Sequence, residues 1–136
     1  MATVIVTRRV HFNAAHRLHN PALSDDENRR LFGPCNNPNY HGHNYELDIS
    51  VAGTIDPTTG FVADLSAVKR IAEEHVLRHL DHKNLNLDVP AFAELNPTSE
   101  NIVVVIWRML EGRLPGTLVR LVLWETPRNR VEYSGT

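Results

Sequence analysis

The sequence lacks several features that define large classes of protein. Its 136 residues include a single cysteine, which excludes a disulfide within the chain. The 14 Lys and Arg residues nearly balance the 16 Asp and Glu residues and are scattered, which argues against a nucleic-acid-binding face. No apolar run is long enough to span a bilayer, and the N-terminal stretch MATVIVTRRVHF lacks the apolar core of a signal peptide. These absences predict a cytoplasmic protein without a nucleic-acid or membrane partner.

The chain does contain enough apolar residues for one core, and it is rich in histidine. Apolar residues make up 42% of the sequence, which at this length predicts a single domain over residues 1–136. Eight residues are histidine. Because imidazole is both a common metal ligand and an acid–base group near neutral pH, the positions of these histidines bear directly on function.

Two segments alternate apolar and polar residues with the period of a β-strand. In residues 4–16 the even positions form a mostly apolar face that ends at His16. In residues 41–53 the odd positions form a second such face, which begins with His41 and His43. Each segment therefore predicts a strand with one buried side.

Helical spacing of apolar residues follows in the middle of the chain. Residues 64–80 predict one helix with Asp64 as its N-cap, and residues 96–112 predict a second, capped by Asn96 or Thr98. The β-branched run VVVI in the second segment leaves a strand as the alternative. The length of the segment and its apolar stripe favour a helix.

The remaining segments complete a β, β, α, α, β, β order. Residues 118–125 predict a strand, and 126–133 predict a turn into a short last strand. The polar connection between the first two strands is long, with a short helix expected at 24–30, and such connections are often functional. Strands at both ends with two helices between them predict an α+β domain, an antiparallel sheet with helices on one face.

Three histidines stand where the apolar faces of the first two strands end. Side chains two apart on a strand point the same way, so His41 and His43 share a face and lie about 7 Å apart along it. His16 ends the other face, and an unpaired imidazole there costs roughly 1–3 kcal/mol. One shared metal ion would satisfy all three. Three neutral imidazoles suit zinc and leave an open coordination position, as in catalytic sites. The alternative is that each histidine only hydrogen-bonds near a strand end.

A second histidine pair competes for the role of metal ligand. His75 and His79 lie four residues apart on the first predicted helix and share a face. They lack the Glu beside the first His that marks an H-E-x-x-H hydrolase. We interpret them as core or interface histidines.

The only cysteine, Cys35, lies in a polar loop, CNNPN, shortly before His41. Free cysteine is usually a small buried apolar residue, but these neighbours are polar. A nearby metal cation would lower the pKa of Cys35 and give a thiolate that can act as base or nucleophile.

Four further polar residues are candidates for the site. Glu125 ends an apolar strand face, which is costly unless its carboxylate meets donors from a ligand. Asp81 and His82 follow the first helix and could relay a proton, although they could also be an ordinary helix end and a solvated histidine. Glu100 lies in the first turn of the second helix, where the helix dipole alone favours an acid.

These stretches together resemble the 6-pyruvoyl-tetrahydropterin synthase family. The resemblance runs through nearly the whole chain, and it is specific because the stretches match in order and spacing. They are FNAAHRLHNPALSDDEN, FGPCNNPNYHGHNY, GTIDPTTGFVADL, LDHKNLNLDVP, NPTSEN and WET.

The resemblance implies a fold and an assembly. The fold is the tunnelling fold (T-fold), in which each subunit supplies a four-stranded antiparallel sheet with two helices on one face. Trimers close these sheets into a barrel, and two trimers stack into a homo-hexamer with active sites at subunit interfaces. This fold agrees with the β, β, α, α, β, β order.

The resemblance also implies roles for the candidate residues. It places zinc on the three histidines at the strand ends. Cys35 would be the base, with Asp81 and His82 as its relay, supplied across a subunit interface. The pterin ring would be bound by Glu125 and Glu100. Glu125 would also take part in catalysis.

The implied activity is that of a carbon–oxygen lyase acting on phosphates. The enzyme would convert 7,8-dihydroneopterin triphosphate to 6-pyruvoyl-tetrahydropterin and triphosphate, in tetrahydrobiopterin biosynthesis. Related 6-carboxy-tetrahydropterin synthases of the queuosine pathway typically have fewer residues between the cysteine and His-Gly-His. Residues 36–40 intervene here, which favours the pyruvoyl product. The alternatives are the carboxy-forming enzyme and a non-catalytic zinc- or pterin-binding protein.

Overall fold

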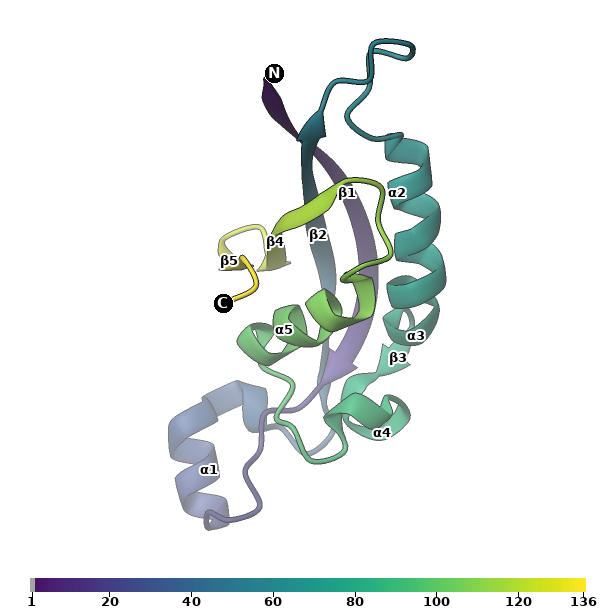
Figure 1. Cartoon of the computed structure of the whole chain (residues 1–136). Helices are drawn as coiled ribbons and strands as arrows, with labels where there is room; N and C mark the ends of the chain where they lie inside the picture. Colours follow the sequence, from purple (N-terminus) through teal and green to yellow (C-terminus); the bar gives the residue numbers. More distant parts are fainter. Residues whose placement is uncertain (1) are drawn as a thin grey trace.

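Two long antiparallel strands form the centre of the protein. The computed structural model describes residues 2–136, and in it β1 (Thr3–His16) pairs with β2 (His41–Thr54) along their full length. The register sets His16 directly opposite His41. The two predicted strands are therefore confirmed, and their pairing brings the ends of both apolar faces together (Figure 1).

Three more strands extend this pair into a five-stranded sheet. Its order is β3-β1-β2-β4-β5, in which β4 (Thr117–Thr126) and β5 (Asn129–Tyr133) are antiparallel to their neighbours. The strand β3 (Lys83–Asn84) runs parallel to the end of β1. The expected four-stranded, wholly antiparallel sheet was therefore wrong. A two-residue strand has no alternation that a sequence pattern could detect.

The order β, β, α, α, β, β also omitted short elements between the predicted ones, although the α+β class is confirmed. The helices are α1 (Asp25–Phe32), α2 (Leu65–Ala72), α3 (Arg78–Leu80), α4 (Leu85–Asp88) and α5 (Ser99–Leu110). The 3₁₀ turns η1 (Gly33–Asn36) and η3 (Pro90–Phe92) and the π-helical turn η2 (Glu73–Leu77) accompany them.

The two predicted helices are present and begin at predicted caps. The Asp64 carboxylate accepts a hydrogen bond from the Ser66 amide at 2.9 Å, and α2 then continues through η2 and α3 as one helical segment. The Thr98 hydroxyl accepts from the Asn101 amide at 3.2 Å, which identifies Thr98 as the cap of α5. The VVVI run is helical because Ile106, its last residue, and Ile102, just before it, lie four apart and are both fully buried on one face of the helix.

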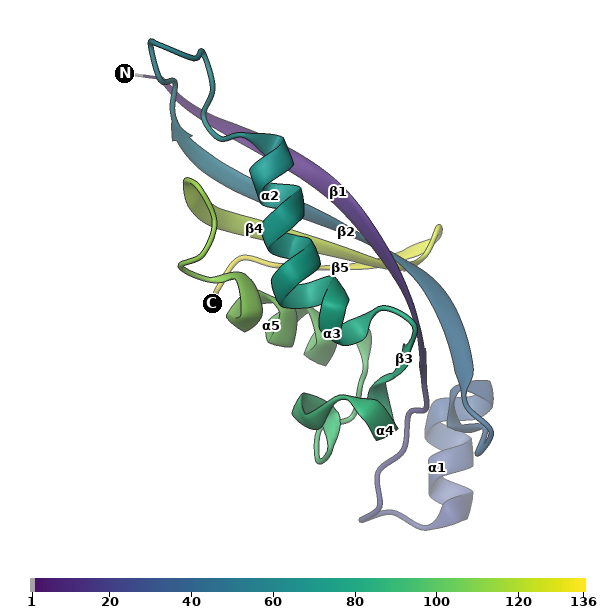
Figure 2. The same cartoon turned by 90° about the vertical axis from the view of Figure 1, so that its right-hand side faces the viewer.

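The long helical segments pack on one face of the sheet and enclose the core (Figures 1 and 2). The apolar faces of β1, β2 and β4 meet α2, α3 and α5 there. Fully buried residues include Leu47, Ile49, Val68, Leu80, Ile106, Leu110 and Leu121. Away from these helices, α1 lies beside the end of β1 and the start of β2 (Figure 2). His16 is the last residue of β1 and His41 the first of β2. Within residues 2–136, no helix is long and apolar enough to cross a bilayer.

Candidate metal centre and active site

Three histidines from β1 and β2 converge at the end of the core. Candidate ligand nitrogens of His16, His41 and His43, one from each ring, all lie within 4.8 Å of one another. The ring centroid of His16 lies 4.6 Å from that of His41 and 5.1 Å from that of His43. This cluster follows directly from strand alternation and from the register that pairs His16 with His41.

The surroundings of His16 fix which of its nitrogens is free. Its Nδ1 lies 2.8 Å from the Pro97 carbonyl oxygen, which can only accept, so Nδ1 carries the proton and donates. Nε2 is then an unprotonated donor atom for a metal. A carbonyl partner on the second ring nitrogen is typical of metal-ligating histidines. Tyr45, which is fully buried, places its hydroxyl 3.4 Å from the same Nδ1.

Burial favours the neutral form of two of these rings, which is the form that binds a metal. Burial lowers the pKa of His16 and, with the nearby His43, that of His41, so both rings stay neutral at neutral pH. The buried side-chain nitrogens without a hydrogen-bond partner in residues 2–136 all belong to these histidines: His16 Nε2, His41 Nδ1, His41 Nε2 and His43 Nε2. Orphaned buried nitrogens in one small volume fit a shared cation.

Cys35 lies in the short turn η1, between the end of β1 and the start of β2. Its carbonyl oxygen accepts a hydrogen bond from the Leu18 amide at 2.8 Å, which ties it to the segment just after His16. Burial, together with the charge of nearby Glu125, raises the pKa of the Cys35 thiol. A cation or a relay must therefore supply the stabilisation that a thiolate would need.

Glu125 reaches the histidine cluster from the end of β4. Its Oε1 lies 3.8 Å from His43 Nε2, and its Oε2 accepts a hydrogen bond from the Ser99 hydroxyl at 2.8 Å. Glu100 and Ser99, at the start of α5, line a hollow of about 220 Å³ together with Glu125. The structure thus brings both predicted pterin-binding acids to one place beside the cluster.

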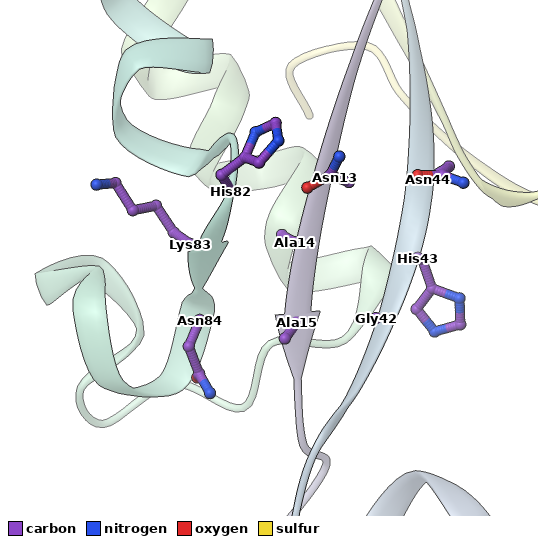
Figure 3. A pocket seen from close by; sticks show the side chains of 9 residues that line it. All are labelled: Asn13, Ala14, Ala15, Gly42, His43, Asn44, His82, Lys83 and Asn84. Carbon is purple, nitrogen blue, oxygen red and sulfur yellow. The ribbon is translucent and has the colours of Figure 1, made fainter.

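Asp81 and His82 form a second polar group, on the other side of β1. Asp81 Oδ1 lies 3.0 Å from His82 Nδ1 and accepts from the Asn13 amide at 3.0 Å. Burial raises the pKa of Asp81, but these hydrogen bonds outweigh it and lower that pKa. Figure 3 shows His82 beyond one side of the strand pair and His43 beyond the other, across a shallow hollow floored by Ala15 and Gly42. Within one chain, His82 and His43 therefore lie on opposite sides of the β1–β2 pair.

Comparison with known proteins shows which family the chain resembles. The family model described as 6-pyruvoyl tetrahydropterin synthase matches residues 5–136. The human 6-pyruvoyl tetrahydrobiopterin synthase is 50% identical over 131 residues, which cover 96% of this chain and 90% of the human one. The Drosophila melanogaster protein of the same name is 46% identical over 132 residues, covering 96% and 79% of the two chains. The chain belongs to the 6-pyruvoyl tetrahydropterin synthase family.

A solved structure from this family extends the match to the fold. The Caenorhabditis elegans 6-pyruvoyl tetrahydropterin synthase superposes with a TM-score of 0.94 at 41% identity, covering 100% of this chain and 98% of that one. The resemblance read from the sequence motifs is therefore confirmed at the level of the family and of its α+β fold.

Two other histidines, His75 and His79, lie outside the histidine cluster. His75 lies in the π-helical turn η2, and His79 follows in α3; neither belongs to the grouped metal-ligand candidates within residues 2–136. Sequence reasoning missed Tyr45 and Ser99, which contact His16 and Glu125. Tyr45 was detectable, because it follows His43 by two residues on the same strand face. Ser99 was not, since its contact joins the start of α5 to the end of β4.

Proposed function

We propose that the protein is a zinc-dependent 6-pyruvoyl-tetrahydropterin synthase that converts 7,8-dihydroneopterin triphosphate to 6-pyruvoyl-tetrahydropterin and triphosphate. The observation that carries the proposal is the cluster of buried histidine nitrogens without hydrogen-bond partners, with Glu125 3.8 Å from His43 Nε2. The human and fly relatives named 6-pyruvoyl tetrahydrobiopterin synthase support it, at 50% and 46% identity over the 131 and 132 residues that align with the chain.

His16, His41 and His43 would hold the metal, and their chemistry favours zinc. Three neutral imidazoles are typical zinc ligands and leave a fourth position open for substrate. When bound, zinc would polarise the side-chain hydroxyls of the substrate and acidify the adjacent C–H bond. The Pro97 carbonyl oxygen keeps the His16 ring in the tautomer and orientation that metal binding requires.

Glu125 and Glu100 would orient the pterin ring. The 2-amino and N3–H groups of a pterin are adjacent donors, and a carboxylate can accept both. The Ser99 hydroxyl already occupies Oε2 of Glu125 and so fixes the plane of the carboxylate. The hollow of about 220 Å³ that both acids line is the proposed entrance for the ring.

Cys35 would remove the proton from the side-chain carbon that the metal acidifies. Asp81 and His82 of a second copy would accept that proton from the thiol and return it later, because within one chain they lie on the other side of β1. Proton loss allows the carbon–oxygen bond to the triphosphate to break. The side chain then becomes a dicarbonyl while the ring gains two hydrogens. Atoms and electrons balance without an external oxidant or reductant.

The single domain over residues 1–136 would work as a homo-hexamer of two stacked trimers. The separation of the relay from the metal cluster supports an active site shared between subunits. We keep a cytoplasmic location as an expectation from the sequence.

The proposal can be tested by incubating the pure, zinc-loaded protein with dihydroneopterin triphosphate and identifying the products by mass spectrometry. We expect triphosphate and a pyruvoyl pterin. A carboxy pterin with acetaldehyde would identify the carboxy-forming relative. Unchanged substrate would indicate a non-catalytic zinc- or pterin-binding protein.

A further inference from the structure

Neither of the strands that carry the histidines positions the proposed base. β1 ends at His16 and β2 begins at His41, whereas Cys35 lies in the turn η1 between them. A proton-abstracting group must stay within hydrogen-bond reach of its substrate, so something else has to fix this turn.

The side chain of Asn36 makes that connection. Asn36 is 5% exposed, and its Nδ2 donates to the Leu18 carbonyl oxygen at 2.7 Å and to His19 Nδ1 at 3.0 Å. The backbone carbonyl oxygen of Asn36 accepts a further hydrogen bond from Arg17 Nε at 2.9 Å. With the bond from the Leu18 amide to the Cys35 carbonyl, four hydrogen bonds join Cys35–Asn36 to residues 17–19.

Residues 17–19 are themselves fixed to the rest of the protein. The Arg17 amide donates to Asn86 Oδ1 at 2.8 Å, and the Arg17 carbonyl oxygen accepts from Asn86 Nδ2 at 2.9 Å. The His19 amide donates to Asn96 Oδ1 at 3.1 Å. Since residues 17–19 directly follow His16, Asn36 links the thiol to the metal cluster through a segment that cannot move freely.

We propose that Asn36 is a positioning residue that holds Cys35 in its reactive place beside the histidine cluster. The assignment rests on the proposed role of Cys35 as the base. Both hydrogen bonds of the Asn36 amide to residues 18 and 19 need an N–H donor, so an acceptor-only side chain cannot replace it. Loss of the amide would free the turn, expose the thiol and misplace it for proton abstraction.

Asn36→Ala tests this, with Asn28→Ala as the matched control. Asn28 is also a buried asparagine of the long connection, and its amide donates to the carbonyl oxygens of Asn20, Leu23 and Ser24 instead. Because Cys35 is the only thiol in the chain, its rate of alkylation by iodoacetamide reports on this one residue. Zinc content, thermal stability, kcat and KM complete the comparison.

In Asn36→Ala we expect kcat to fall by about 10- to 100-fold with KM and zinc content nearly unchanged, because a small misplacement can cost that much. Alkylation of Cys35 should become faster. Asn28→Ala should move neither rate, even if it lowers thermal stability. If Asn28→Ala loses as much thermal stability without showing these two changes, general destabilisation does not explain them.

Two outcomes would overturn the proposal: an unchanged kcat in Asn36→Ala, or equal losses in both variants in proportion to stability. If Asn36→Ala does not fold, Arg17→Met removes the guanidinium, and with it the Nε hydrogen bond to the Asn36 backbone carbonyl oxygen, and should change both rates in the same directions. If the wild type converts no dihydroneopterin triphosphate, the proposed function fails. Alkylation alone then decides whether Asn36 holds Cys35: faster alkylation in Asn36→Ala supports it, and equal rates refute it.

Discussion

At the scale of single residues, the protonation of Cys35 is the main constraint on the chemistry. Burial and the Glu125 carboxylate both raise the pKa of this thiol. A thiolate there therefore needs a neighbouring cation to stabilise it, or a group that accepts its proton. The histidine cluster and the Asp81–His82 pair are the groups that could supply them. Because the histidine cluster and the Asp81–His82 pair are separate groups of residues, substitutions can test the contribution of each to Cys35 independently.

Cys35→Ala should abolish proton abstraction while leaving the ligand sites intact. We expect turnover of dihydroneopterin triphosphate to fall by about 10²- to 10⁴-fold, the typical contribution of a positioned base. Zinc content and pterin binding should not change, because the histidines and Glu125 are untouched. Release of triphosphate, metal analysis and pterin fluorescence titration measure these three properties. Activity that survives in this variant would mean that another residue is the base.

His43→Ala should release the metal. Two remaining imidazoles cannot complete a three-ligand zinc site, so zinc should leave during dialysis against a weak chelator. His79→Ala is the control, since His79 lies in α3 outside the grouped ligands, and this variant should keep its zinc. Full zinc occupancy in dialysed His43→Ala would rule out the proposed ligand set.

The convergence of the three histidines could be predicted from the sequence because strand period and apolar faces are local properties. His41 and His43 alternate with their neighbours, and His16 ends its own face in the same way. Asn36 and Ser99 could not be found by this reasoning. Their partners, Leu18 and Glu125, are 18 and 26 residues away, and only the folded chain brings them together.

At the scale of elements, the exposed face of the sheet carries a cross-strand ion pair. Arg9 on β1 stands opposite Asp48 on β2, and its Nε and Nη2 contact the two carboxylate oxygens at 2.6 and 3.0 Å. The guanidinium groups of Arg9 and Arg130 lie 5.6 and 5.1 Å from the centroid of the Trp124 ring. The hydrogen bond from Arg9 lowers the pKa of Asp48 below its ordinary value of 3.8.

Arg9→Gln should therefore change how stability depends on pH. A lowered pKa means that folded Asp48 binds protons less readily than the unfolded chain does. The stabilisation is present above the ordinary pKa of 3.8 and is lost as pH falls through the folded pKa. In urea unfolding at about pH 5, the free energy of unfolding should be slightly larger for the wild type than for Arg9→Gln. This difference should shrink as the pH is lowered towards about pH 2. Arg8→Gln, whose register partner is Ile49, is the control. A gap that does not vary with pH would contradict this account.

The elements also show the limit of pattern-based prediction. Both long strands and both long helices were predictable because each has a continuous apolar period, and the helices also begin at the polar caps Asp64 and Thr98. β3 was not, because its two residues acquire strand geometry only by lying beside Ala14 and Ala15 of β1. The π-helical turn η2 likewise leaves no mark on the apolar spacing around it.

At the scale of the whole molecule, a single chain leaves its proposed active site incomplete. His82 adopts a left-handed backbone conformation, with φ of 60°, and its amide donates to the Asn13 carbonyl oxygen at 2.7 Å. This conformation fixes the relay on the far side of β1 from His43 (Figure 3). Within the described residues, β3 covers only the last part of the outer edge of β1. Open strand edges are a common route to association between subunits.

Mixing two inactive variants tests whether subunits share active sites. Cys35→Ala and His82→Ala should each be nearly inactive alone. Co-expressed, they should form oligomers in which about one quarter of the sites combine an intact Cys35 with an intact His82 from a neighbour, and activity should return to that level. Cys35→Ala mixed with His43→Ala is the control, because both changes affect the same half of the site and no intact site can form. No recovery in the first mixture, with mixed oligomers confirmed by mass spectrometry, would place the relay and the base in one subunit.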